Sequence, residues 1–489
     1  MLRLSFDRGT LLIHPPRDGA MAAPETFAAL DLPGCVYDRR VRRWRAPAMR
    51  YREVLTALHR GGHDYADDAR AYATLALTPR VEREPYPYQR EAVAAWMRKR
   101  RGVIVLPTGA GKTWVAQMII ARLQRSALVV TPTLDLMQQW FGALGTNFEL
   151  PIGLLGGGYH DIQPLTVTTY DSAYLHMERL GDRFGLLIFD EVHHLPSPAY
   201  GAAAEMAIAP FRLGLTATPE REDGAEVRLD GLVGPEVYRR DIQELSGRYL
   251  ADYETVTLRV RLSPEERAAY EAARAIYRGF VAERGIRLGG RHGWSNFLMH
   301  TSRSEAGRRA FLAYRAQKTI AQASEAKLRL LAQLLVRHRH DRLLIFTSDN
   351  ATVYAIARRF LIPPITHQTK VKERHAILQA FNDGRYPFVV TSRVLNEGVD
   401  VPAASVGVVL SGSGSVREHV QRLGRILRRG DRKQAVLYEV IAEDTAEEYT
   451  SARRRQHSAY QDAAAGGEAP PPDDRPADTD ASVDAGGAD

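Results

Sequence analysis

Short, nearly continuous runs of apolar residues recur in two long stretches of the chain, and segments with helical spacing separate them. In residues 81–245 the runs cover residues 102–106, 127–131, 165–169, 186–190 and 213–216. In residues 326–462 they cover residues 342–346, 388–391, 406–410 and 435–440. Such runs alternating with helices are typical of parallel strands buried on both faces. The pattern predicts an α/β protein with two parallel-sheet domains in tandem.

The first 80 residues follow a different pattern, with polar and apolar positions alternating over residues 2–14 around a turn at Arg8 and Gly9. A second hairpin-like stretch spans residues 37–49, and apolar positions at helical spacing begin at Tyr51 and end before Gly61. These signals predict a small N-terminal α/β domain in residues 1–80.

An arginine-rich stretch lies within this N-terminal domain. It contains Arg39, Arg40, Arg42, Arg43, Arg45, Arg50 and Arg52, with Trp44 and Tyr51 between them. Basic residues interleaved with aromatic rings suit phosphate contacts and base stacking. A solvated strand face is the alternative, and the sequence alone leaves both open.

Residues 246–325 interrupt the alternation of strands and helices and are predicted to form a helical insertion. Ser263, Pro264 and Glu266 make a capping box with proline at the first helical position, which starts a helix that runs to about residue 280. The segment is basic, with Arg259, Arg261, Arg267, Arg274, Arg278, Arg284, Arg287 and Arg291. We interpret these arginines as a grip on a nucleic-acid backbone, with ordinary solvated helix charges as the alternative.

Composition separates the last residues from the rest of the chain. Residues 463–489 hold seven acidic residues against Arg475 and are rich in alanine, glycine and proline, which predicts a disordered acidic tail. The rest of the chain is therefore more basic than the net charge of +8 for all 489 residues implies. A positive body favours a polyanionic partner.

Cysteine content and hydropathy indicate the compartment. The one cysteine, Cys35, excludes an intramolecular disulfide and fits a reducing environment. No apolar run approaches the roughly 18 residues of a membrane span, and the N-terminus lacks the apolar block of a signal peptide. These features predict a cytoplasmic protein that does not enter a membrane.

A phosphate-binding loop follows the first apolar run of the first sheet. Residues 106–113 read Leu-Pro-Thr-Gly-Ala-Gly-Lys-Thr. The turn itself consists of Thr108, Gly109, Ala110 and Gly111. Its backbone N–H groups are expected to approach phosphate oxygens, while Lys112 neutralises the β and γ charges of a nucleoside triphosphate. Thr113 is predicted to ligate Mg²⁺.

The carboxylates of Asp190 and Glu191 stand at the end of the apolar run 186–190. Because the carboxyl ends of parallel strands meet at one edge of a sheet, we expect both carboxylates beside the phosphate loop. Asp190 is predicted to hold Mg²⁺, partly through water, and Glu191 to orient or deprotonate the attacking water. His193 and His194 are not predicted to bind a metal, because adjacent side chains on an extended segment point apart.

The second predicted sheet has no phosphate loop of its own. Such a domain usually supplies groups to a nucleotide that the first domain holds, so we expect ATP between the two. Arg425 and Arg428 lie on one face of a predicted helix with Gln421, and they are predicted to reach the γ-phosphate. Gly398 and Asp400, upstream, are further candidate nucleotide-binding residues. For Arg425 and Arg428, the alternative is that they are basic residues on an exposed helix.

Taken together, the motifs of this chain resemble those of superfamily 2 helicases, and within them those of the XPB family. The matching blocks are residues 88–89, 106–113, 131–134, 168–172, 190–194, 214–218, 345–347, 391–402 and 421–428. The tetrad Asp190-Glu191-Val192-His193 and the Arg221-Glu222-Asp223 triplet, or RED motif, resemble the XPB variant in particular. The resemblance implies two RecA-like domains, an N-terminal damage-recognition domain and a thumb-like insertion.

The resemblance also implies an activity. It points to an ATP-dependent DNA helicase or translocase of 3′ to 5′ polarity in nucleotide excision repair, using ATP and Mg²⁺, with DNA and a nuclease as partners. Gln89 would read adenine, although the family usually has arginine where Tyr86 stands. Thr133, Thr216, Thr218 and the RED motif would couple the nucleotide site to DNA.

Two alternatives remain open at the level of the sequence. An RNA helicase or remodeller is the first, because the motor motifs do not read the 2′-hydroxyl. A non-catalytic DNA-binding platform that recruits a nuclease is the second. The intact Lys112, Glu191, Arg425 and Arg428 argue against it, because a scaffold has no use for hydrolytic groups.

Overall fold

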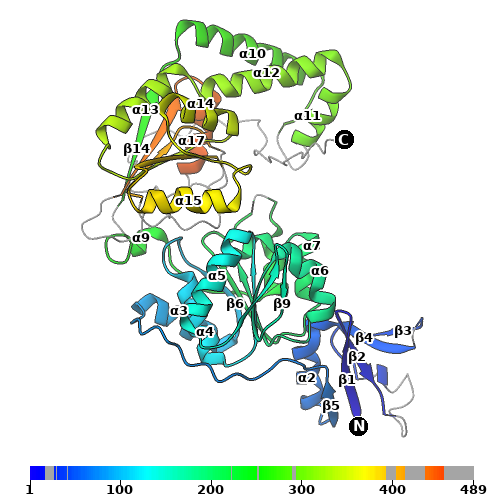
Figure 1. Cartoon of the computed structure of the whole chain (residues 1–489). Coiled ribbons are helices and arrows are strands. Elements are labelled where there is room, and N and C mark those ends of the chain that lie inside the picture. Colours follow the sequence, from blue (N-terminus) through cyan, green and yellow to red (C-terminus); the bar gives the residue numbers. More distant parts are fainter. Residues whose placement is uncertain are drawn as a thin grey trace. The chain divides into compact units, whose positions relative to one another are not determined.

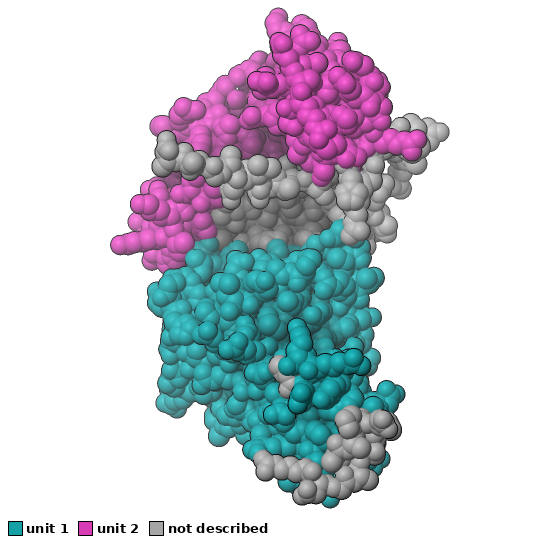
Figure 2. All heavy atoms as spheres, turned by 90° about the vertical axis from the view of Figure 1, so that its right-hand side faces the viewer, with its two compact units in different colours: residues 1–240 teal, residues 241–489 magenta. Residues whose placement is uncertain are grey.

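The computed structural model divides the chain into two compact units, residues 1–240 and residues 241–489 (Figure 2). It describes residues 1–16, 27–28, 30–40, 42–221, 223–250, 253–288, 293–392, 404–412 and 435–455. The predicted acidic tail therefore lies outside the described residues. Within those ranges, no helix combines the length and the apolar character needed to cross a bilayer.

A five-stranded sheet opens the first unit, with strand order β3-β4-β2-β1-β5. Its strands are β1 Leu2–Asp7, β2 Thr10–His14, β3 Val36–Asp38, β4 Arg43–Pro47 and β5 Tyr65–Asp68. The predicted hairpin is confirmed: β1 and β2 pair antiparallel around Arg8 and Gly9, both at positive φ, as two-residue hairpin turns prefer. The predicted helix is α2, Tyr51–Arg60, which follows the 3₁₀ turn η2, Ala48–Arg50.

The arginine-rich stretch of this domain is only partly free to contact a ligand. Tyr51 is 2% exposed, and its hydroxyl donates to Asp67 at 2.6 Å. The predicted stacking role of Tyr51 is therefore wrong, because the helical spacing that starts at this residue turns its ring into the core. Trp44 packs against Phe27 and Tyr37, with ring centroids 4.7 Å and 5.2 Å away.

The rest of the first unit is built on an eight-stranded sheet of order β13-β6-β12-β11-β7-β10-β8-β9. The strands are β6 Arg101–Val105, β7 Ala127–Thr131, β8 Ile152–Gly156, β9 Tyr159–Asp161, β10 Leu165–Thr169, β11 Leu186–Asp190, β12 Phe211–Thr216 and β13 Glu236–Arg239. All pairs are parallel except β8 with β9. The five predicted strands of this sheet are confirmed, and β8, β9 and β13 extend it toward its edges.

Helices cover both faces of this sheet (Figure 1). They are α3 Pro87–Lys99, α4 Lys112–Leu123, α5 Leu134–Asn147, α6 Tyr170–Leu180 and α7 Pro198–Glu205, with the short helices η3 Val192–His194, η4 Ala225–Arg228 and α8 Leu229–Leu232. In Figure 1, α3, α4 and α5 lie on one side, and α6 and α7 on the other. The helices α4 and α5 connect β6 to β7 and β7 to β8, moving along the sheet in one direction, whereas α6 and α7 connect β10 to β11 and β11 to β12 in the opposite direction. Right-handed crossovers in opposite directions place their helices on opposite faces of the sheet.

The second unit contains a six-stranded parallel sheet of order β14-β19-β18-β15-β17-β16. Its strands are β14 Tyr253–Val260, β15 Leu343–Phe346, β16 Pro364–Ile365, β17 Phe388–Thr391, β18 Val406–Val409 and β19 Ala435–Ala442. Its helices are α9 Ile242–Leu245, α13 Glu325–Arg337, α14 Asn350–Phe360, α15 Val371–Asn382 and α17 Ala446–Arg455. The four predicted strands of this sheet are confirmed.

Strand β14 corrects the sequence analysis, which placed its residues in the helical insertion. It pairs parallel with β19 over eight residues and forms the edge of the second sheet. Val256, Leu258 and Val260 pack on the core and alternate with polar residues along the strand. That alternation lacks the continuous apolar run of the central strands and hides the strand from the pattern.

The helical part of the insertion consists of α10 Pro264–Glu283, α11 Gly293–Ser302 and α12 Glu305–Gln322. The predicted capping box is confirmed, with the Ser263 hydroxyl accepting from Glu266 N at 3.2 Å and the Glu266 carboxylate accepting from Ser263 N at 3.1 Å. A separate cluster of Phe280, Leu288, Phe297 and Ala310 packs α10, α11 and α12 together. The three helices therefore form an arm with a small core of its own.

A glycine in β6 yields a prediction about stability. Gly102 has φ +142°, and a Cβ there would lie 2.5 Å from Pro235 O, whereas a Cβ on Gly142 in α5 would meet nothing within 4 Å. We expect Gly102→Ala to destabilise the protein by about 1–3 kcal/mol. Gly142→Ala, the matched control, should stabilise it by about 0.5–1 kcal/mol. Thermal unfolding midpoints measure both, and a Gly102→Ala midpoint at or above that of the wild type would contradict the prediction.

Candidate active site

The phosphate loop connects β6 to α4 at the carboxyl edge of the first sheet. Gly109 and Gly111 have φ of +87° and +79°, conformations that glycine adopts without strain, and Gly111 caps α4. Lys112 Nζ donates to Leu106 O at 3.2 Å, so its ammonium lies across the loop. The buried hydroxyl of Thr108 has no hydrogen-bond partner among the described residues. The loop and the start of α4, where Thr113 lies, present the donors that a bound phosphate requires.

Gln89 and Tyr88 both donate hydrogen bonds to the backbone of this loop. Gln89 is 1% exposed; its Nε2 donates to Ala110 O at 3.0 Å, and its Oε1 accepts from Tyr86 N at 3.0 Å. The Tyr88 hydroxyl donates to the same carbonyl at 2.8 Å. Both ends of the Gln89 amide thus bind the chain's own backbone, and a bidentate contact to adenine would require these bonds to be exchanged. Reading of adenine by Gln89 stays a prediction.

Asp190 is the last residue of β11, and Glu191 follows it; β11 lies two strands away from β6 in the sheet. Asp190 Oδ2 accepts from Trp140 Nε1 at 2.8 Å, and its Oδ1 accepts from Glu191 N at 3.1 Å. The hydroxyl of Tyr170 donates to Asp190 O at 3.0 Å. Glu191 has a left-handed backbone, with φ 46° and ψ 56°. This turn places two carboxylates side by side immediately after a buried strand.

The electrostatics of this pair differ from those of a surface carboxylate. Burial, together with the charge of Glu191, raises the pKa of Asp190 to about 6, while the Trp140 hydrogen bond and the Lys112 ammonium act in the opposite direction. A bound cation would relieve the repulsion between the two carboxylates. The site therefore suits a divalent metal ion, and carboxylate and hydroxyl oxygens are ligands that Mg²⁺ prefers.

A chain of polar contacts leads from Glu191 to the end of β12. Thr216 Oγ1 lies 3.5 Å from Glu191 Oε2 and 3.1 Å from His193 Nδ1. The same Thr216 oxygen accepts from Thr218 N at 3.2 Å. These side chains are buried, so a displacement at one of them is transmitted through direct contacts rather than through water.

Arg221 of the RED motif extends this chain toward the surface. Its Nη1 donates to His193 O at 2.6 Å, and its Nε and Nη2 bind the Asp223 carboxylate at 2.8 Å and 2.7 Å. The hydrogen bonds from Arg221 hold the pKa of Asp223 well below its usual range. Glu222 lies outside the described residues, so two of the three motif residues are placed: Arg221 contacts the buried chain at His193 O, and Asp223 binds Arg221.

The remaining predicted site residues fall into two groups. Thr133 caps α5, its hydroxyl accepting from Leu136 N at 3.3 Å, and Thr131 Oγ1 donates to Thr133 O at 3.2 Å. The second group lies outside the described residues and comprises Gly398, Asp400, Gln421, Arg425 and Arg428. Their roles at the nucleotide stay predictions.

Sequence reasoning assigned no role at this site to Trp140 or Tyr170, although Tyr170 lies in the matching block 168–172. Both bind Asp190 directly, one at the carboxylate and the other at the carbonyl. Each lies on the buried stripe of its helix, where a large aromatic residue is indistinguishable from an ordinary core residue. Only the three-dimensional arrangement distinguishes the polar atom of each ring as a positioning contact.

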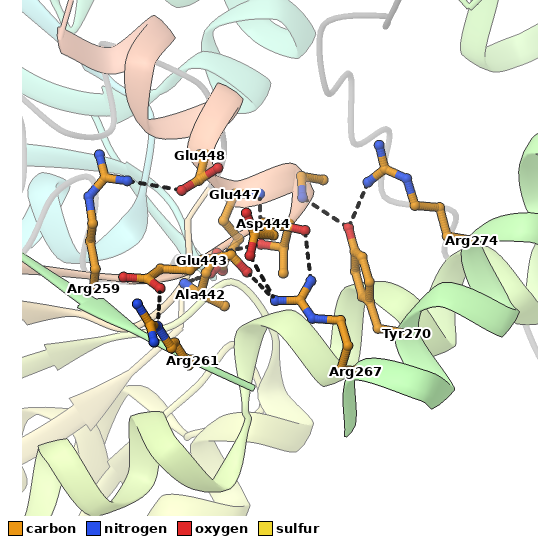
Figure 3. Close-up of polar contacts among 12 residues, drawn as sticks. Arg259, Arg261, Arg267, Tyr270, Arg274, Ala442, Glu443, Asp444, Glu447 and Glu448 are labelled. Carbon is orange, nitrogen blue, oxygen red and sulfur yellow. Dashed lines mark hydrogen bonds and ion pairs between the residues drawn. The ribbon is translucent and has the colours of Figure 1, made fainter. Parts of the chain in front are cut away.

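The arginines of the predicted insertion are not all available for DNA (Figure 3). Arg259 pairs with Glu448 at 3.0 Å and Arg261 with Glu443 at 2.9 Å. Arg267 donates to the carbonyls of Glu443 and Asp444 at 2.8 Å and 3.0 Å, and Arg274 donates to the Tyr270 hydroxyl at 2.8 Å. Arg261 and Arg267 thus tie the insertion to the turn after β19, and Arg259 binds Glu448 in α17. These contacts favour attachment for the three arginines, and the predicted grip on a nucleic-acid backbone stays a prediction.

Family models match three parts of the chain. Residues 4–69 match the xeroderma pigmentosum group B helicase damage recognition domain. Residues 82–221 match the type III restriction enzyme res subunit, and residues 326–430 the helicase conserved C-terminal domain. The DNA 3′-5′ translocase XPB2 of Sulfurisphaera tokodaii is 40% identical over 82% of this chain and 97% of that protein.

The chain belongs to the XPB family of helicases. The DNA 3′-5′ helicase XPB of Kineococcus radiotolerans is 32% identical over 74% of this chain and 60% of that protein. The crystal structure of the Pyrococcus furiosus Hef helicase domain aligns with a TM-score of 0.51 at 21% identity, covering 76% of this chain and 98% of that domain. The likeness to the solved structure supports the fold of tandem RecA-like domains.

The contact between Trp140 and Asp190 makes the ionisation of Asp190 observable. In protein freed of divalent cations, we expect tryptophan emission to change with a midpoint near pH 6. Below that pH Asp190 is protonated, so Trp140 Nε1 donates to a neutral oxygen; above it the same oxygen is charged. The chain has five tryptophans, so the Trp140→Phe difference spectrum isolates the signal. An unchanged titration in Asp190→Asn would contradict this assignment.

Proposed function

We propose that this protein is an ATP-dependent DNA helicase or translocase that moves 3′ to 5′ and acts in DNA repair. The observation that carries the proposal is the convergence of Lys112, Asp190 and Glu191 at one edge of the first sheet, joined to Arg221 by buried contacts. Membership of the XPB family supports DNA rather than RNA as the substrate.

Each residue of the cluster has a defined task in hydrolysis. Mg²⁺, when bound, would neutralise charge on the phosphate oxygens. Thr113 and Asp190 are the residues that would hold it, and Lys112 would neutralise the charge of the β and γ phosphates. Glu191 orients the attacking water and accepts its proton. Trp140 keeps the Asp190 carboxylate in one orientation, so that little rearrangement accompanies the reaction.

The contacts from Glu191 to Arg221 supply a route for coupling hydrolysis to movement on DNA. When the charge near Glu191 changes, the hydrogen bonds of Thr216 and His193 must readjust, because both side chains are buried and in direct contact with each other. Arg221 binds the carbonyl of His193 and lies partly at the surface. The nuclease partner implied by microbial relatives stays a prediction.

Exposed basic residues on the arm are the candidate DNA contacts of the second unit. Arg278, Arg308, Arg309 and Arg315 are exposed, and within the described part of the chain they have no acidic partner. Arg308 and Arg315 lie seven residues apart, on one face of α12. The base of the insertion thus serves attachment, and its distal helices retain free charge for phosphates.

Removing the Glu191 carboxylate or the Lys112 ammonium should strongly lower DNA-stimulated ATP turnover. We expect Glu191→Gln to lower kcat by about 10²–10⁴-fold, because the amide cannot accept a proton from water. Lys112→Ala should lower turnover by a comparable factor through loss of the cation that faces the phosphates. Phosphate release measured with and without DNA tests both variants.

Controls separate these effects from the loss of a charge elsewhere. Glu149→Gln removes an exposed carboxylate of the same unit and should leave turnover unchanged. Full turnover in Glu191→Gln would refute the mechanism. If matched RNA strands stimulate ATP hydrolysis and DNA strands do not, the substrate is RNA rather than DNA. If the protein displaces a strand only from a duplex with a 5′ tail, the proposed 3′ to 5′ polarity is wrong.

Arginines of the arm should contribute to DNA affinity through phosphate contacts. We expect the double variant Arg308→Ala with Arg315→Ala to bind duplex DNA more weakly and to reduce the salt slope of log Kobs by about 0.9 per lost contact. Arg385→Ala is the control, because Arg385 is exposed and already pairs with Asp383 at 3.2 Å. Equal salt slopes for the double variant and the wild type would exclude this surface as a DNA contact.

A further inference from the structure

A lysine is completely buried in the second unit, at a place that no predicted motif includes. Lys327, in the first turn of α13, is 0% exposed. Its ammonium donates to Glu447 Oε2 at 2.6 Å and to Leu410 O at 2.6 Å. The same Glu447 oxygen, in the first turn of α17, accepts from Ala442 N at the end of β19, at 3.0 Å (Figure 3). One charge therefore joins α13, the residue after β18 and the start of α17.

Stability alone does not account for this arrangement. Removing a lysine and a carboxylate from water carries a large desolvation cost, and apolar residues of similar size often replace a buried ion pair without loss of stability. A charged pair at such a site is better explained by the geometry that it imposes. The geometry here is that of Leu410, the residue immediately after β18, whose carbonyl is oriented by the ammonium.

A second set of contacts holds the next residue of the same segment. Ser411 Oγ accepts from Ser348 N at 2.9 Å, and Ser348 Oγ donates to Gln322 Oε1 at 2.8 Å, at the end of α12. Leu410 N also donates to Phe346 O at 3.0 Å. Leu410 and Ser411 are thus held by α13, by β15 and by the residue Ser348 that follows β15, at the point where the chain continues toward Gln421, Arg425 and Arg428.

We propose that Lys327, paired with Glu447, is a positioning residue for ATP hydrolysis: it anchors Leu410 and thereby the root of the segment that carries Arg425 and Arg428. The proposal rests on the proposed function, in which those arginines act on the triphosphate. Lys327 does not touch the nucleotide. It acts through the Leu410 carbonyl, eleven residues upstream of the first predicted nucleotide-facing residue of that segment, Gln421.

The double variant Lys327→Met with Glu447→Gln tests the anchor without leaving a buried charge. Methionine fills similar space, and the glutamine oxygen can still accept from Ala442 N, so we expect a thermal midpoint close to that of the wild type. We expect kcat for DNA-stimulated hydrolysis to fall by roughly tenfold or more, a part of the 10³–10⁵-fold that an arginine finger supplies. KM for ATP should change by less than about twofold, because Lys112 and the phosphate loop remain.

Hydrogen exchange of residues 404–412 provides a readout that does not depend on activity. It should accelerate in the double variant and remain unchanged in Lys372→Met, which removes an exposed lysine of α15 in the same unit. A double variant with wild-type kcat and wild-type exchange overturns the proposal. So does a double variant that no longer folds, because the pair would then be structural.

Failure of the proposed function would look different from failure of the anchor. If the wild-type chain shows no DNA-stimulated ATP hydrolysis, the proposed function is wrong. Exchange in residues 404–412 then still decides whether Lys327 anchors this segment: unchanged exchange in the double variant overturns the anchor, and accelerated exchange supports it.

Discussion

Two adjacent buried carboxylates, Asp190 and Glu191, impose the demands that the first unit is built to meet. Their repulsion and their burial favour proton uptake, which shows in the raised pKa of Asp190. The indole of Trp140 and the ammonium of Lys112 offset part of this cost but do not form a complete ion pair. A site that keeps such a pair poorly compensated is prepared to receive a cation, and its electrostatic strain is the source of its affinity.

Parallel pairing is what brings these groups together from distant parts of the sequence. The residues at the carboxyl ends of β6, β12 and β11 lie at one edge of the sheet, because all three strands run in the same direction. This much is predictable from the apolar runs, since a parallel sheet leaves no other place for the loops that follow its strands. The strand ends containing Asp190 and Thr216 were therefore placed correctly by pattern alone.

Other features depend on contacts that a linear pattern does not contain. An edge strand such as β14 has one packed face and therefore lacks the continuous apolar run of a central strand. Gln89 resembles a ligand-reading residue, yet the structure uses its amide to close a helix cap and to support Ala110 O. Likewise, arginine content alone does not distinguish Arg267, which binds backbone carbonyls, from Arg308, which is exposed.

Each unit places a buried charge at the carboxyl end of a central strand of its sheet. In the first unit Asp190 is the last residue of β11; in the second the ammonium of Lys327 meets the carbonyl that follows β18 and is balanced by Glu447. Neither arrangement is the most stable packing available to such a site, because buried charges are costly even when paired. What each provides is a fixed direction for one atom, and hydrolysis of the phosphoanhydride bond of ATP depends on positioning more than on covalent assistance. A motor domain therefore retains buried charges where an ordinary core would contain leucine.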